Sequence, residues 1–123
     1  MSAMSEQTVI LFRPVGEVEM KLIEASGMTA FPPRLPEQPI FYPVTNQQYA
    51  EKIARDWNTK DERSGYVGYV LRFAVNADYL KQFPVKQVGD REHTEYWIPA
   101  ERLEEFNRNI VGKVEVLQIF RRD

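Results

Sequence analysis

The sequence predicts a single compact α+β domain, with about five or six strands in an antiparallel or mixed sheet and about three helices. Its length of 123 residues is typical of one domain and is enough to bury a core. Short β-branched and apolar runs alternate along the chain with amphipathic helical segments. Most of these runs lie too close together for the long crossovers that parallel strands require, which favours antiparallel pairing.

The first two elements follow from the residues up to position 25. Residues 8–12 (TVILF) predict a strand, and Arg13 and Pro14 are expected to close it because proline cannot continue a central strand. Residues 17–25 (EVEMKLIEA) repeat apolar side chains at helical spacing and predict an amphipathic helix. The side chains expected on its core face are Val18, Leu22 and Ala25, with Met20 and Ile23 beside them.

A proline-rich segment separates this helix from the next. Five prolines between Phe31 and Pro43, with Pro43 counted, exclude a helix and predict an extended loop that runs into residues 40–42 (IFY). Prolines order an extended segment in advance and lower the entropy lost when a ligand is clamped. We therefore expect residues 32–39 to lie over a ligand cleft and to carry Arg34 toward it.

The middle of the chain predicts a helix followed by the longest strand. Asn46 is a good N-cap for a helix through Trp57, in which apolar side chains recur four residues apart. Residues 66–75 (YVGYVLRFAV) are apolar and contain no proline, so we expect this strand to be central and paired on both sides. The remaining predicted elements are a short helix within 76–83, a strand at 84–88, a strand at 93–98, a helix at 100–109 ended by Gly112, and a last strand at 113–120.

Composition limits the chemistry that this domain can perform. The chain has no cysteine and a single histidine, so disulfides and thiolate metal sites are excluded and we expect no metal. The 16 basic and 18 acidic side chains give a net charge of −2, which offers no support for electrostatic binding to nucleic acid.

The beginning of the chain indicates where the protein resides. Residues 1–7 are small and polar, so we expect a disordered N-terminus before a single domain at 8–123. They lack the basic and apolar regions of a signal peptide, and no apolar run approaches the roughly 20 residues of a membrane span. The sequence therefore predicts a cytoplasmic protein without a membrane partner, and delivery by a dedicated secretion system stays open.

Polar and aromatic side chains at strand ends are the candidates for function. The guanidinium of Arg13 can grip a phosphate with two parallel hydrogen bonds, and Tyr42 can stack on a nicotinamide or adenine ring. His93 and Glu95 lie two apart on a predicted strand and therefore project from the same face. The structural alternatives are a surface arginine, a core tyrosine, and a glutamate that protects a sheet edge or forms a salt bridge.

Four features occur in an order that points to one family of folds. An arginine ends the first strand, and an aromatic strand leads into a helix rich in tyrosine and alanine (FYPVTNQQYAEKIARDW). A long strand (GYVLRF) and a later strand with a glutamate (TEYWIP) follow. This order resembles the ADP-ribosyltransferase fold. Residues 95–112 (EYWIPAERLEEFNRNIVG) also look like the C-terminal end of small bacterial toxin-type ADP-ribosyltransferase domains.

The resemblance implies that NAD binds to this domain, and it indicates which residues hold it. Arg13 matches the residue that holds the dinucleotide, and Tyr42, with Thr45 nearby, matches the support for the nicotinamide ribose and base. Glu95 matches the glutamate that binds the ribose 2′-hydroxyl and stabilises positive charge as the nicotinamide bond breaks. His93 matches the residue that helps to present the acceptor.

The implied function is an NAD-dependent ADP-ribosyltransferase or NAD-cleaving enzyme that uses no metal. Arg13 and Arg34 would hold the pyrophosphate, and Glu95 would face the oxocarbenium-like ribose from the same side of the sheet. The family's serine-threonine-serine strand is absent, and a histidine replaces the glutamine or glutamate of arginine-modifying members, so the acceptor stays open. The alternatives are a non-catalytic nucleotide-binding domain of the same fold, and a protein-interaction domain that docks its partner on residues 31–42.

Overall fold

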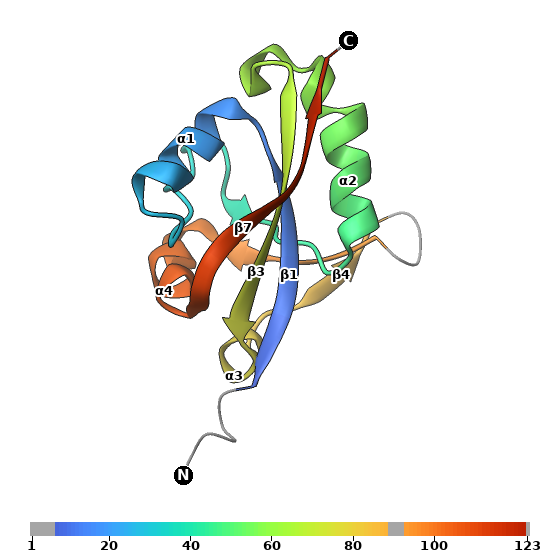
Figure 1. The fold of residues 1–123 in the computed structure, drawn as a ribbon. Helices are drawn as coiled ribbons and strands as arrows, with labels where there is room; N and C mark the ends of the chain where they lie inside the picture. The colour runs from blue at the N-terminus through green and yellow to red at the C-terminus, as the bar shows by residue number, and fades with distance from the viewer. Residues whose placement is uncertain (1–6, 89–92, 123) are drawn as a thin grey trace.

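An antiparallel sheet of three strands forms the centre of the computed structural model, which describes residues 7–88 and 93–122 (Figure 1). Strand β3 (Val67–Asn76) lies between β1 (Thr8–Val15) and β7 (Ile110–Arg121) and is antiparallel to both. The predicted α+β class and the predicted central strand are therefore confirmed. Because this strand has no proline, its backbone groups can enter a ladder on either side.

Two short antiparallel ladders lie beside this sheet. Strand β2 (Ile40–Phe41) pairs with β6 (Ile98–Pro99), and β4 (Val85–Gln87) pairs with β5 (Thr94–Tyr96). The single strand predicted at 93–98 is therefore two short strands, β5 and β6, that pair with different neighbours.

Val44 connects the central sheet to the β4–β5 hairpin. Its N–H donates to the Phe12 carbonyl and its carbonyl accepts from the Phe12 N–H, both at 2.8 Å. On its other side Val44 is bridged to Glu95 of β5. Directly opposed residues point to the same face of a sheet, so these three side chains share one face. The order across the fold is therefore β7, β3, β1, residues 43–45, β5 and β4.

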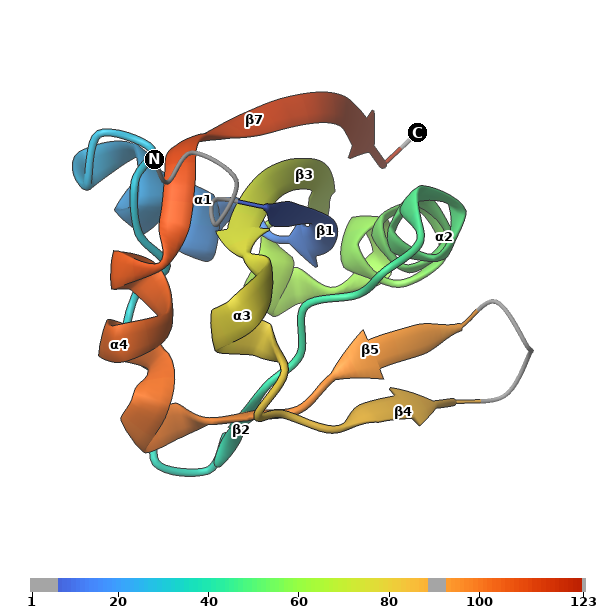
Figure 2. The same ribbon diagram turned by 90° about the horizontal axis from the view of Figure 1, so that it is seen from below.

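Helices cover both faces of this sheet. Helix α2 packs on one face, whereas α1, α3 and α4 pack on the other (Figure 2). As predicted, Asn46 caps α2, because its side-chain oxygen accepts a hydrogen bond from the Tyr49 N–H at 3.1 Å. The described residues form the helices α1 (Glu17–Ala25), α2 (Gln47–Asp56), α3 (Ala77–Leu80) and α4 (Leu103–Arg108), and the 3-10 turns η2 (Asn58–Lys60), η3 (Glu62–Ser64) and η4 (Ala100–Arg102).

Strand β1 continues to Val15, which corrects the prediction that it ends at Phe12. Pro14 lies inside the strand and is paired with Val70. Phe12 directs its N–H and carbonyl away from β3, toward Val44. Pro14 lies two residues further along and has the same orientation, so its missing N–H falls on the outer edge of the strand, where no ladder needs it. Most of the segment predicted to be disordered, residues 1–7, lies outside the described residues.

Helix α1 has the predicted bounds but turns a different face to the core. Met20 and Ile23 are 2% and 0% exposed, whereas Val18 and Leu22 are 63% and 50% exposed. Both pairs fit helical spacing, so periodicity alone does not choose between them. In the observed rotation of the helix, Glu19 forms an ion pair with Arg13 of β1 and Met20 points at the sheet.

The last strand begins earlier than predicted, because Gly112 does not end the preceding helix. Gly112 has a φ of +79° and lies within β7. A positive φ is open to glycine without strain. The register between the pairs Arg72–Glu115 and Ala74–Val111 is irregular, and Gly112 lies in that stretch.

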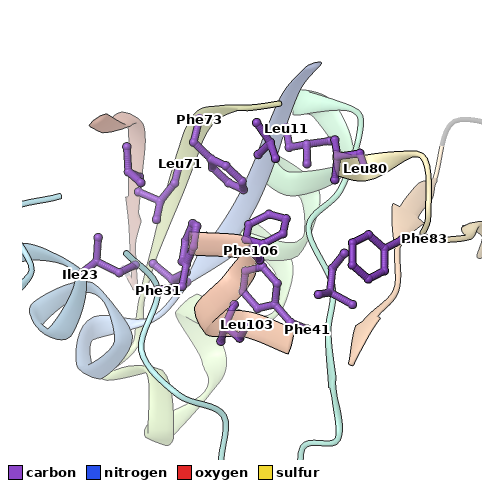
Figure 3. Close-up of a cluster of buried hydrophobic side chains, with 14 of the residues drawn as sticks. Leu11, Ile23, Phe31, Phe41, Leu71, Phe73, Leu80, Phe83, Leu103 and Phe106 are labelled. Carbon is purple, nitrogen blue, oxygen red and sulfur yellow. The ribbon is translucent and has the colours of Figure 1, made fainter. Parts of the chain in front are cut away.

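The larger apolar core lies between the sheet, α1 and α4 and is rich in phenylalanine (Figure 3). Phe31 contacts Phe73 edge-on with ring centroids 4.8 Å apart, and Phe41 contacts Phe106 in the same way at 5.3 Å. Such edge-on pairs stabilise a core by more than the area they bury. They hold the proline-rich loop and α4 against β3.

A smaller apolar cluster lies under α2, on the opposite face of the sheet. The absence of a side chain at Gly68 lets this helix approach β3 closely: a Cβ at this position would lie 2.5 Å from the carbonyl oxygen of Ala54. The buried members of the cluster are Val44, Ala50, Ala54 and Val70.

Candidate functional site

Glu95 places a nearly buried carboxylate between β5 and α2. The residue is only 9% exposed. Its Oε1 accepts a hydrogen bond from Trp97 Nε1 at 2.9 Å, and its Oε2 accepts a longer one from the Tyr49 hydroxyl at 3.4 Å. Both donors are neutral, and Glu95 forms no ion pair with any residue of the described ranges. A buried charge is costly unless it is paired, so this arrangement calls for an explanation.

Aromatic rings surround this carboxylate. The His93 ring is stacked on the Tyr49 ring, with centroids 4.2 Å apart and planes 4° from parallel. Tyr42 meets Trp97 edge-on at 5.7 Å. Burial, followed by the charge of Glu95 and the hydrogen bond to it, raises the pKa of Tyr49, so the phenol stays protonated and donates at neutral pH.

The local structure explains why these groups meet. Alternation along a strand places His93, Glu95 and Trp97 on one face. The prediction that His93 and Glu95 share a face is confirmed, since both contact Tyr49. Tyr49 comes from the first turn of α2, whose start is set by the Asn46 cap.

Lys86 on β4 adds a positive charge to this face. It is directly opposite Glu95 in the β4–β5 ladder, and its Nζ lies 5.5 Å from the centroid of the Trp97 ring. We refer to the whole group as the Glu95 cluster, and its members are Tyr42, Tyr49, Lys86, His93, Glu95 and Trp97.

Arg13 lies on the other face of the sheet. Its neighbour Phe12 shares a face with Glu95 through the paired bridges, and successive strand residues point to opposite faces. The Arg13 guanidinium donates two parallel hydrogen bonds to Glu19, at 2.7 and 3.1 Å, and its carbon lies 4.5 Å from the centroid of the Phe41 ring. The prediction that Arg13 and Glu95 grip one ligand from one side is therefore wrong, because the pleat of the sheet separates them.

Arg34 accompanies Arg13 and not Glu95. Its Nε donates to the Ile40 carbonyl at 3.2 Å, and its guanidinium lies 5.9 Å from the centroid of the Phe41 ring. Burial and the charge of Arg13 lower the pKa of Arg34. The proline-rich loop thus carries Arg34 to Phe41 and Arg13 on the face away from Glu95, and not toward a cleft at Glu95 as predicted.

Thr45 and Tyr42 belong to the segment that joins β2 to α2 beside β5. The Thr45 N–H donates to the Thr94 carbonyl at 3.0 Å, and the two threonine hydroxyls are hydrogen-bonded to each other, so Thr45 fastens residues 43–45 to β5. The Tyr42 ring packs edge-on against Trp97, and the charge interaction of its phenol opposes the lowering of the Arg34 pKa.

Sequence reasoning missed three members of the Glu95 cluster. Trp97 lies two residues after Glu95, so the alternation that paired His93 with Glu95 would also have found it. Tyr49 and Lys86 come from elements that are distant in the sequence. Only the packing of α2 and the register of the β4–β5 ladder bring them to this site.

A hollow away from the Glu95 cluster, the grouping of potential metal ligands and the length of the helices also bear on possible sites in the described residues. A shallow hollow of about 840 Å³ lies between residues 29–33 and α4, away from the Glu95 cluster. Within residues 7–88 and 93–122, no three histidine, aspartate or glutamate side chains gather so that they could hold a metal ion. None of the helices in these ranges is both long and apolar enough to cross a membrane.

No protein-family model, no curated protein and no solved structure matches this chain. The resemblance to ADP-ribosyltransferases therefore stays a prediction. The inference of function depends on the geometry of the Glu95 cluster.

Proposed function

We propose that this domain binds a nucleotide of the nicotinamide dinucleotide class, NAD, at the Glu95 cluster. The observation that supports this best is the nearly buried Glu95 carboxylate, which forms no ion pair with any described residue. Leaving a buried charge unpaired costs on the order of several kcal/mol. A nearly buried carboxylate whose hydrogen-bond donors are both neutral can therefore gain from a ligand that supplies hydroxyl groups or positive charge.

The chemistry of the cluster suits a nucleoside. A carboxylate has about four lone-pair positions for hydrogen bonds, and the Tyr49 and Trp97 donors take two of them. The others can accept the hydroxyls of a ribose. The rings of Tyr42 and His93 offer apolar surface for a flat base, and the uncompensated negative charge favours the cationic nicotinamide ring.

The position of Arg13 favours binding over turnover as the primary proposal. In the predicted enzyme Arg13 anchors the phosphates beside Glu95, but it is paired with Glu19 on the opposite face. NAD cleavage is the second candidate, and Glu95 itself supports it. A fixed anion near the ribose stabilises an oxocarbenium-like transition state more than the ground state.

The alternative is a purely structural role, in which Glu95 only fastens α2 to β5 through its hydrogen bond with Tyr49. Calorimetric titration of NAD into the wild-type protein and Glu95→Gln separates the alternatives. The exposed α1 glutamate Glu24 provides a matched control, Glu24→Gln. A hydrogen bond to a charged group contributes about 1.5 to 3 kcal/mol, so we expect Glu95→Gln to weaken NAD binding by about tenfold or more. The control should bind as the wild type does.

An assay for free nicotinamide in the same samples distinguishes the binding domain from the enzyme. The enzyme candidate requires nicotinamide release by the wild type, and a release roughly a hundredfold slower in Glu95→Gln with NAD binding nearly intact. If the wild-type protein neither binds NAD nor releases nicotinamide, both proposals fail. Glu95 is then a structural residue.

A further inference from the structure

We infer that Lys86 is the phosphate-binding cation of the Glu95 cluster and that the ligand bound there carries a phosphate; this inference depends on the proposed function. Lys86 and Glu95 occupy opposed positions in the β4–β5 ladder. Directly opposed residues of an antiparallel pair project from the same face, so both side chains border one surface.

Lys86 and Glu95 do not neutralise each other, although opposed unlike charges on paired strands commonly do. No ion pair joins them. Trp97 contacts both groups: its Nε1 donates to Glu95 at 2.9 Å, while its ring lies 5.5 Å from the Lys86 Nζ. Each charge is therefore joined to Trp97, and neither is neutralised by the other.

Two further cations on the described part of α2 are already engaged. Lys52 and Arg55 on α2 both form ion pairs with Asp56, at 3.5 and 3.0 Å. The two arginines that were expected to grip the phosphates lie on the opposite face. Among the residues that the structure describes, Lys86 is thus the cation of the Glu95 cluster that forms no ion pair.

A carboxylate and an ammonium that do not neutralise each other favour a ligand that carries hydroxyl or cationic groups in one part and an anionic group in another. The Glu95 carboxylate takes hydroxyl groups or a cationic ring, and the Lys86 ammonium is a compact point charge that suits a phosphate oxygen. The cluster should therefore distinguish NAD, which carries phosphates, from nicotinamide riboside, which has the same ring and ribose but no phosphate.

The experiment compares the affinities of NAD and nicotinamide riboside by calorimetry in the full chain. Lys86→Met removes the charge but keeps an unbranched side chain over Trp97, and Lys86→Arg restores a cation. Lys113→Met, at an exposed lysine on β7, is the control for net charge. We expect Lys86→Met to weaken NAD binding about tenfold, the factor typical of one charge-assisted hydrogen bond, and to leave riboside binding unchanged. Lys86→Arg and Lys113→Met should bind NAD within about twofold of the wild type.

Three results with the Lys86→Met variant would overturn the inference, and two results with the wild-type protein would do so as well. Lys86→Met could leave NAD binding unchanged, could weaken NAD and riboside by the same factor, or could weaken NAD no more than Lys113→Met does. A wild-type protein that binds riboside as tightly as NAD would refute the phosphate contact and leave the proposed function standing. A wild-type protein that binds neither would refute the proposed function, and this inference with it.

Discussion

Gly68→Ala should push helix α2 away from the sheet and destabilise the domain. A Cβ at this position would lie 2.5 Å from the Ala54 carbonyl oxygen and 2.8 Å from its Cα, whereas ordinary contact begins at 3.4 Å. The obstructing atoms belong to the helix backbone, so no change of rotamer relieves the overlap. The helix must retreat by several tenths of an ångström.

The loss of stability follows from the packing between α2 and β3 that this shift of the helix loosens. Ala50 and Ala54 of α2 are fully buried against Val70 of β3. A radial gap of roughly 0.5 to 1 Å forfeits about a quarter to a half of the dispersion energy across an interface. Overpacking typically costs about 1 to 3 kcal/mol. Because the backbone of a whole helix has to shift, we expect Gly68→Ala to lower the free energy of unfolding by about 3 kcal/mol, a large share of the roughly 5 to 15 kcal/mol of a whole domain.

Urea unfolding followed by far-ultraviolet circular dichroism measures this loss. Gly27→Ala is the matched control, because Gly27 has a φ of +79° and an added Cβ would meet no described atom within 4 Å beyond its chain neighbours. It should cost only the backbone strain of a left-handed alanine, about 1 kcal/mol. If Gly68→Ala costs no more than Gly27→Ala, the close approach of α2 to β3 does not exist in solution. Tyr49 lies on the same helix, so NAD affinity should fall together with stability.

Three further perturbations test the caps and charges. Asn46→Ala should lower the free energy of unfolding by about 1 kcal/mol in urea, because the Tyr49 N–H loses its acceptor, whereas Asn46→Asp should preserve it. Glu19→Gln should lower the free energy of unfolding by about 2 kcal/mol, since it breaks a largely buried ion pair. It should not change NAD affinity in calorimetry. If Glu19→Gln and Glu95→Gln weakened NAD binding equally, Arg13 would lie at the ligand after all. Raising the pH above about 10 should lower the urea midpoint, because burial first and a bonded carboxylate second raise the folded-state pKa of three tyrosines above the ordinary 10.0. Their contribution to stability is complete below the unfolded-state pKa and is lost as the pH rises through the folded-state values. A urea midpoint that does not change between about pH 8 and about pH 11 would contradict this prediction. The three residues are Tyr49, Tyr69 and Tyr79.

Features that depend on near neighbours in the chain were predictable. The bounds of α1 and the Asn46 cap of α2 follow from spacing and from one side chain next to a helix start. The central position of β3 follows from its length and its lack of proline. The common face of His93 and Glu95 follows from the alternation of side chains along a strand.

The same reasoning predicted only part of the candidate site. Alternation relates residues within one strand, so it linked His93 to Glu95 but said nothing about Arg13 on another strand. The two strands are related through the bridges of Val44, and an offset of one residue in that register moves Arg13 to the opposite face. The sequence contains no local signal for that register.

The sequence by itself therefore determined the bounds of α1, the N-cap of α2, the central position of β3 and the common face of His93 and Glu95. Only the tertiary structure decided which face of α1 is buried, where Pro14 is tolerated, and which charges surround Glu95. The physical reason is that spacing within an element defines its faces but not its neighbours. Neighbours are chosen by strand register and by the close approach of α2 at Gly68, and these contacts join residues far apart in the chain.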